Sequence, residues 1–191
     1  MNRALILNLI IVLITSCRSP VQPQERTLLN INALISKSFD HYRKEPPAQM
    51  IKTLRYEDKL DQKHFDTTEF GKIDTLFREV NIHKSAYLNS YYITDRPLQK
   101  SINSNLHHLS YRIKEDETAP VKRLDYFYEG KAGEEKPVAL LILKKDFNKL
   151  YKSTQIIRAT FEEGWLEQLE IAGTENILFR EPTAYDLLYQ F

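Results

Sequence analysis

Eight runs rich in β-branched and aromatic residues fill most of the chain after residue 85, and this feature constrains the fold most strongly. The runs are AYLNSYYIT, LHHLSYRI, VKRLDYFY, PVALLIL, LYKSTQIIRATF, WLEQLEIAG, NILF and AYDLLYQF. Turn segments such as EGKAGEE, KKDFN, EEG and GTE separate these runs and keep the connections short. Because a parallel crossover needs roughly a dozen residues or more, the short connections predict a long antiparallel meander.

Two helices are predicted ahead of these strands. Apolar residues recur at spacings of three and four from Thr27 onward, and Pro46 ends this helix because proline has no amide donor. A second helix begins after Asp66, which can act as an N-cap acceptor three residues before Glu69. Between the helices the pattern predicts a hairpin with its turn near Glu57.

These elements predict a single α+β domain over residues 27–191, in which two helices pack on a curved antiparallel meander sheet. In WLEQLEIA, alternation predicts that Trp165, Leu169 and Ile171 share one face of the sheet. Leu166 is expected on the opposite, solvated face. PVALLIL is apolar on both faces and is therefore predicted as the central strand.

The N-terminus has the features of a leader segment. Asn2-Arg3 gives a short positive region, and an apolar run of about eleven residues follows from Ala4. This run is too short to cross a bilayer, which takes roughly 20 residues, but it matches the core of a signal peptide. It ends in Ile14-Thr15-Ser16-Cys17, which resembles the lipobox of bacterial lipoproteins. The resemblance implies cleavage after Ser16 and acylation of Cys17, the only cysteine.

The leader divides the N-terminal region in two. Residues 1–16 are predicted to be the lipoprotein signal peptide, and residues 17–26 the lipidated cysteine with a polar, proline-containing flexible tether. Two or more acyl chains anchor a protein stably, at roughly 0.8 kcal/mol for each buried CH₂. Arg18 follows the cysteine where an aspartate would resemble an inner-membrane retention signal. We therefore expect attachment to the outer membrane, facing the periplasm.

A second resemblance covers most of the mature chain. It consists of the leader, a hairpin with K-T-L, a helix ending F-R-E-V-N-I-H-K-S, a Y-K-S-T-Q strand and the segment I-A-G-T-E-N-I-L-F. This order resembles small, uncharacterised lipoproteins of Bacteroidota-type bacteria. The resemblance implies no activity.

The chain shows no motif typical of a catalytic, cofactor or metal site. His107 and His108 are adjacent on a predicted strand, so their side chains should point to opposite faces and cannot share one ion. No G-x-S-x-G elbow or H-E-x-x-H occurs, and the glycines are too scattered for a phosphate loop. Glu134-Glu135 and Glu162-Glu163 lie in predicted turns, where we expect solvated carboxylates. The net charge of +1 provides no broad basic surface for nucleic acid.

Two functions remain open, and neither is enzymatic. The first is a binding or structural module that contacts an envelope protein through an exposed sheet edge or an aromatic patch. The alternative is a carrier of a hydrophobic, acyl-chain ligand, because helices closing a curved sheet resemble the plan of the periplasmic lipoprotein-localisation proteins. The residues that would line such a groove, or else form a plain core, are Tyr91, Tyr126, Tyr128, Ile142, Ile157 and Trp165.

Overall fold

The structure is a computed structural model that describes residues 29–82, 84–87, 89–98, 105–131 and 134–191. The predicted signal peptide, Cys17 and the tether lie outside the described residues. The helices are α2 (Ile31–Lys44) and α3 (Phe70–Glu79). The strands are β1 (Ile51–Tyr56), β2 (Lys59–His64), β3 (Tyr91–Pro97), β4 (Leu106–Ile113), β5 (Val121–Glu129), β6 (Lys136–Phe147), β7 (Tyr151–Glu162), β8 (Trp165–Ile177) and β9 (Thr183–Gln190).

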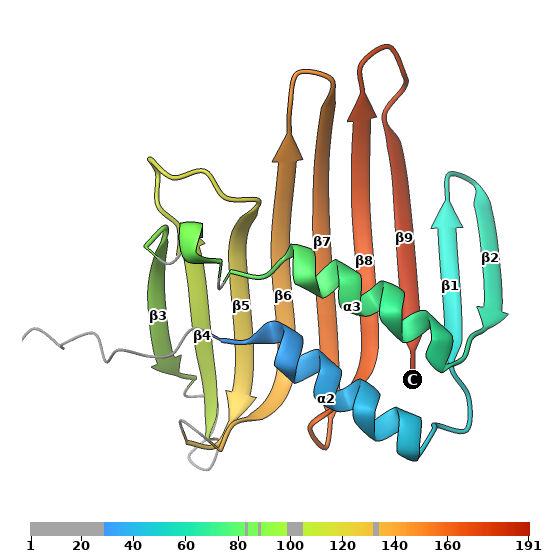
Figure 1. Cartoon of the computed structure of the whole chain (residues 1–191), viewed down its shortest axis with the longest axis vertical. Helices are drawn as coiled ribbons and strands as arrows, with labels where there is room; N and C mark the ends of the chain where they lie inside the picture. Colours follow the sequence, from blue (N-terminus) through green and yellow to red (C-terminus); the bar gives the residue numbers. More distant parts are fainter. Residues whose placement is uncertain (1–28, 83, 88, 99–104, 132–133) are drawn as a thin grey trace, which may run out of the picture.

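All nine strands belong to one antiparallel sheet, so the predicted α+β class is confirmed (Figure 1). The strand order is β2-β1-β9-β8-β7-β6-β5-β4-β3. Strands β3 to β9 form a meander, and the β1–β2 hairpin joins it beside the last strand, β9. The PVALLIL run lies in β6, next to the central strand β7, so its predicted central position is wrong by one strand.

The predicted helices and the first hairpin are present, and their ends follow from local chemistry. The Asn30 side chain accepts a hydrogen bond from the Ala33 amide and begins α2, which ends at Lys44 ahead of the two prolines. Asp66 accepts a hydrogen bond from the Thr68 amide at 2.8 Å and begins the short 3-10 turn that leads into α3. Glu57 has a φ of 52° in the β1–β2 turn, at the predicted position.

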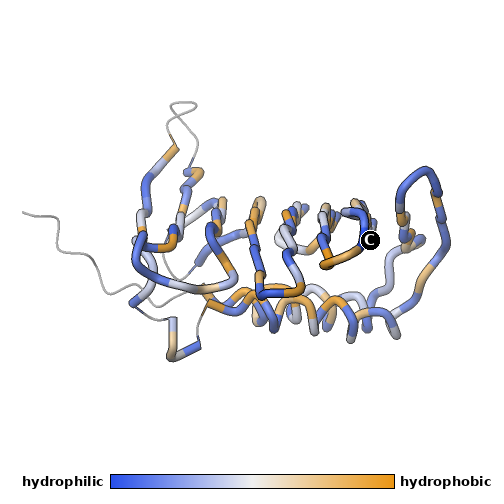
Figure 2. Tube along the Cα trace, turned by 90° about the horizontal axis from the view of Figure 1, so that it is seen from above, coloured by the Kyte–Doolittle hydropathy of each residue, from blue (hydrophilic) through white to orange (hydrophobic). Residues whose placement is uncertain are grey.

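Both helices lie side by side on one face of the sheet (Figures 1 and 2). In the described part of the chain, no helix covers the opposite face, and no helix is long and apolar enough to cross a membrane. The core forms between the helices and the sheet. Its members with 2% exposure or less are Ile31, Ile35, Phe39, Phe70, Ile73, Phe77, Val80, Ile82, Tyr111, Leu124, Tyr126, Tyr128, Leu140, Ile142, Ile157, Ala159, Leu166 and Leu169.

Two expectations about strand ends are wrong. The run AYLNSYYIT becomes a strand only at Tyr91, because Ser85–Tyr87 forms a 3-10 turn. The GTE segment is no turn, since β8 continues through it to Ile177. Gly173 lies in this strand because the Tyr185 ring covers it: a Cβ at that position would come within 2.4 Å of the ring.

A β-bulge overturns the predicted faces of β8. Phe161 pairs with Leu166 and Thr160 with Gln168, so Glu167 is an extra residue in the ladder. The extra residue places Leu166 on the buried face together with Leu169, where both side chains are fully buried. The prediction that Leu166 faces solvent is therefore wrong.

Candidate functional site

Five of the six predicted groove residues lie in the core. Tyr91, Tyr126, Tyr128, Ile142 and Ile157 are all buried and belong to the hydrophobic core. Their polar atoms are used there: the Tyr91 hydroxyl donates to the Val121 carbonyl oxygen at 2.9 Å, and the Tyr128 hydroxyl bonds to Asp95. Burial, and next the neighbouring Tyr87, raises the pKa of Tyr91 to about 12. These side chains pack against one another as core, so their placement does not support an acyl-chain groove. The groove stays a prediction.

Trp165 is the exception, and it marks a different surface. It is partly buried and begins β8, directly after a two-residue turn made by Glu163 and Gly164. Both turn residues have positive φ, 52° and 92°, as the favoured two-residue hairpin turns require. The turn places the Trp165 ring at the end of the sheet, against the side of α2.

Side chains of α2 fix this end of β8 in place. The Ser38 hydroxyl accepts a hydrogen bond from the Leu166 amide at 3.0 Å, and the Tyr42 hydroxyl donates to the Leu166 carbonyl oxygen at 2.7 Å. Both bonds are buried, so α2 satisfies both backbone groups of one strand residue. Burial raises the pKa of Tyr42, and the charges of Glu167 and Glu162 raise it further, so the hydroxyl remains a donor.

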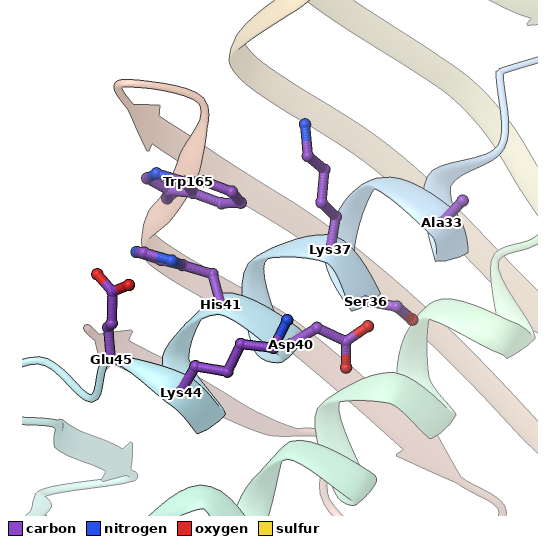
Figure 3. Close-up of a pocket in the computed structure, with 8 residues that line it drawn as sticks. All are labelled: Ala33, Ser36, Lys37, Asp40, His41, Lys44, Glu45 and Trp165. Atoms are coloured by element: carbon purple, nitrogen blue, oxygen red, sulfur yellow. The ribbon is translucent and has the colours of Figure 1, made fainter.

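One hollow lies between Trp165 and the polar side of α2 (Figure 3). The rings of Trp165 and His41 stack with centroids 4.1 Å apart, and Lys37 Nζ lies 5.3 Å from the centre of the Trp165 ring. Lys44 contributes a further cation, and Asp40 and Glu45 contribute two carboxylates, so the wall of this hollow carries both charge signs. The hollow has a volume of about 500 Å³ and is open to solvent.

A second hollow lies beside Trp165 and is acidic. It has a volume of about 340 Å³, and its wall contains Glu162, Glu163 and Glu167. The remaining wall is aromatic, formed by Tyr42 and by Phe191, whose rings stack with centroids 5.6 Å apart. The predicted exposure of Glu162 and Glu163 is confirmed, and both line this hollow.

This arrangement suits recognition of a partner that carries both charge signs. An indole held by stacking offers a rigid apolar contact, and residues of this kind contribute much of the energy of protein interfaces. Cations lie on one side of the ring only, next to two carboxylates, whereas the charged groups on the other side are all carboxylates, so a bound segment would be oriented as well as held. We call this surface, with its two hollows, the Trp165 surface.

A Ser, His and Asp also meet on the sheet, but not in the order that nucleophilic catalysis needs. Ser110 Oγ donates to Asp125 Oδ1 at 2.8 Å, and His108 Nε2 lies 2.8 Å from the same oxygen. Arg123 Nε donates to the other carboxylate oxygen. A catalytic triad needs the histidine between the serine and the acid, whereas here both bind the carboxylate. The cluster satisfies a fully buried charge.

Electrostatics at Asp125 follow from these contacts. Burial alone would raise the pKa of Asp125, but hydrogen bonds from Arg123, His108 and Ser110 outweigh it and hold the pKa below its ordinary value. His108 stacks on Phe127, while the adjacent His107 stacks on Tyr128. Since Phe127 and Tyr128 alternate on β5, the prediction that the two histidines face opposite sides is confirmed.

Sequence reasoning missed the partners of Trp165 and of Asp125. A signal existed for the first set, because Lys37, His41 and Lys44 recur at helical spacing on one side of α2. Which strand that side meets depends on tertiary packing and is not encoded in the spacing. Within the described ranges, no group of three His, Cys, Asp or Glu residues is placed to hold a metal ion.

No protein-family model, curated protein or solved structure matches the chain. The Trp165 surface therefore has to be interpreted from its own residues.

Proposed function

We propose that this chain is a lipoprotein of the cell envelope, anchored through acylated Cys17 in the outer membrane and facing the periplasm. Its α+β body, two helices on a curved meander, is a non-catalytic binding module. The Trp165 surface is its contact site for an envelope protein partner.

The N-terminal sequence supports the anchor. The apolar run and the segment Ile14-Thr15-Ser16-Cys17 resemble a lipoprotein leader. The polar, proline-containing sequence that follows Cys17 suits a link between bilayer and body.

The single observation that supports binding is the position of Trp165 between a hollow whose wall carries both charge signs and a hollow whose charged groups are all carboxylates. Trp165 is the only tryptophan in the chain, and its ring is held in place by His41 rather than packed away in the core. A large aromatic side chain fixed at an open surface is typical of an interface anchor.

The anchor is tested with Cys17→Ser. We expect the variant to move from the membrane fraction to the soluble fraction, because serine cannot receive the thioether-linked lipid. Unchanged fractionation would contradict the anchor.

Binding is tested with Trp165→Ala by cross-linking in intact envelopes. Loss of an interface anchor typically costs about 2 kcal/mol, or roughly thirty-fold in Kd, so the cross-linked partner should largely disappear. Tyr92→Ala is the matched control, because Tyr92 is an aromatic residue with 61% exposure on the edge strand β3.

Trp165→Ala could also weaken binding by disturbing the fold, so a second variant that leaves the fold intact is needed. Glu163→Lys changes only the charge of an exposed turn residue and should also weaken the cross-link. Loss with Tyr92→Ala but not with Trp165→Ala or Glu163→Lys would assign binding to the sheet edge instead.

A further inference from the structure

The β6–β7 and β8–β9 turns lie at the end of the sheet opposite the β7–β8 turn (Figure 1). Large apolar side chains are exposed in both turns. We call residues 147–150 and 177–181 the hairpin tips. Their exposed side chains include Phe179 at 95%, Phe147 at 70%, Leu150 at 63% and Leu178 at 47%. A soluble domain does not need such a concentration of exposed apolar area, and it is typical of a contact surface.

The two tips form one continuous surface. The Leu178 amide donates to the Leu150 carbonyl oxygen at 2.9 Å, which joins the β8–β9 turn to the β6–β7 turn. A hollow of about 210 Å³ lies where they meet, lined by Leu150 and Leu178 together with Lys149 and Lys152. The apolar side chains therefore act as a single patch.

Phe179 is exposed and has a backbone conformation that is unfavourable for a bulky residue. The Arg180 amide donates to the Ile177 carbonyl oxygen at 3.0 Å, so residues 177–180 form a closed turn. Phe179 is its third residue and has a φ of 66°, the left-handed region in which such turns prefer glycine or asparagine. A bulky side chain here is strained and makes no packing contact that would offset the strain.

The charges around the patch are mostly positive. Its exposed cations are Lys145, Lys149, Lys152 and Arg180, against one exposed carboxylate, Glu181. The other two acids in the strand ends that border the tips are engaged within the fold: Asp146 pairs with Lys144 at 3.0 Å, and Glu175 accepts from the Tyr151 hydroxyl at 3.3 Å. The exposed acids of residues 115–117 lie at the same end of the sheet but in the separate β4–β5 turn. An apolar patch bordered by cations is complementary to an anionic lipid bilayer.

We propose that the hairpin tips insert into the surface of an anionic lipid bilayer and so form a second contact between this chain and its membrane. The proposal rests on the anchor at Cys17, which holds the body near the bilayer. Acyl chains limit how far a tethered body can move from the membrane but do not set its orientation. Insertion of the tips would orient the body relative to the bilayer.

The chain is long enough for both contacts. Residues 17–28 span at most about 40 Å when extended, and β7, with 12 residues, is about 40 Å long. Because α2 begins beside the middle of the sheet, the segment from Cys17 can reach the membrane plane that the tips would touch (Figure 1). The Trp165 surface would then point away from the bilayer.

The test uses the full chain, isolated with its native N-terminus and reconstituted into vesicles. Acylation leaves no free thiol at Cys17, so a single introduced cysteine can carry a polarity-sensitive dye. Glu181→Cys places the dye at the tips and keeps every apolar and cationic side chain there. Glu163→Cys is the matched control, since it replaces an exposed glutamate in the hairpin turn at the opposite end.

We expect the dye at position 181 to shift its emission to the blue and to become several-fold less accessible to iodide in vesicles containing phosphatidylglycerol. The shift should be smaller in pure phosphatidylcholine, and the dye at position 163 should not change. Phe147→Ser with Phe179→Ser, made in the Glu181→Cys background, should abolish the shift. Both side chains are exposed, so this variant should fold.

The outcomes separate the two proposals. If the chain floats with vesicles but the dyes at positions 181 and 163 behave alike, the tip contact is wrong and the anchor stands. If neither labelled chain floats with vesicles, the anchor itself fails. A shift at position 181 that requires an added envelope protein rather than anionic lipid would overturn the lipid contact in favour of a protein contact.

Discussion

Two turns at opposite ends of the sheet both hold a non-glycine residue in the left-handed conformation, but with different residue types. In the β7–β8 turn, Glu163 has a φ of 52° and is followed by Gly164, which adopts such angles freely. In the β8–β9 turn, Phe179 has a φ of 66° and no glycine shares the turn. The first turn has residues suited to closing a hairpin in water, whereas the second exposes an aromatic ring.

The surroundings differ in the same way. Around the β7–β8 turn, carboxylates line the outside and aromatic residues pack inward, where Phe191 stacks with Tyr42. Around the β8–β9 turn, cations and large apolar side chains both face outward. The difference shows that the end with the β7–β8 turn holds one aromatic side chain, Trp165, in a fixed position that suits a protein contact. The end with the β8–β9 turn exposes apolar and cationic side chains that suit contact with a bilayer.

Effects of substitutions at either end of the sheet have to be distinguished from effects on folding. A substitution at Asp125 provides the reference, because it should change stability alone. It lies away from both ends and is fully buried. Asp125→Asn removes the charge that Arg123, His108 and Ser110 neutralise or bond. We expect a loss of about 3 kcal/mol in the free energy of unfolding at pH 7, measured by urea denaturation.

Asp58→Asn is the matched control, because Asp58 is exposed in the β1–β2 turn, and it should change stability by less than about 0.5 kcal/mol. The effect at Asp125 also has a defined pH dependence. Its folded-state pKa is lowered, so its contribution is fully present above the unfolded pKa, about 3.9, and is lost as the pH falls through the folded value. A difference from wild type that stayed constant down to pH 2 would contradict this assignment.

The smallest expected effect is at Phe179. Phe179→Gly removes the strain of a left-handed phenylalanine and no packing, so the unfolding free energy should rise by about 0.5 kcal/mol. The same variant should weaken the shift of a dye at position 181 in anionic vesicles. Glu163→Gly should likewise leave the fold intact but should not affect that dye. Destabilisation by Phe179→Gly would show that the ring serves the fold, and the contrast between the two ends would fail.

Much of the fold was predictable because local signals agreed with the tertiary structure. Asp66 and the prolines after Lys44 set helix ends through backbone hydrogen bonding, and these positions were anticipated. The errors arose where a distant residue decided the outcome. Gly173 signals a turn by itself, yet the Tyr185 ring twelve positions on keeps it in a strand. Simple alternation predicted that Leu166 faces solvent, but the bulge at Glu167 reverses the alternation and places Leu166 on the buried face.

The functional surfaces were less predictable. Trp165 was identified as a candidate, but in a groove with residues that lie in the core. Its partners on α2 come together through packing between a helix and a strand that are far apart in the sequence. The hairpin tips were missed because the apolar run NILF predicts a strand, whereas β8 ends at Ile177 and the next two residues form the turn.

The roles proposed for both surfaces depend on the proposed attachment at Cys17, and the mass of the N-terminal peptide tests that attachment most directly. The protein should be purified from envelopes, cleaved with a protease and analysed by mass spectrometry. The account predicts a peptide that begins at Cys17 and carries a diacylglyceryl group on the thiol and a fatty acid on the amino terminus. A peptide that still contains residues 1–16, or a Cys17 with a free thiol, would contradict it.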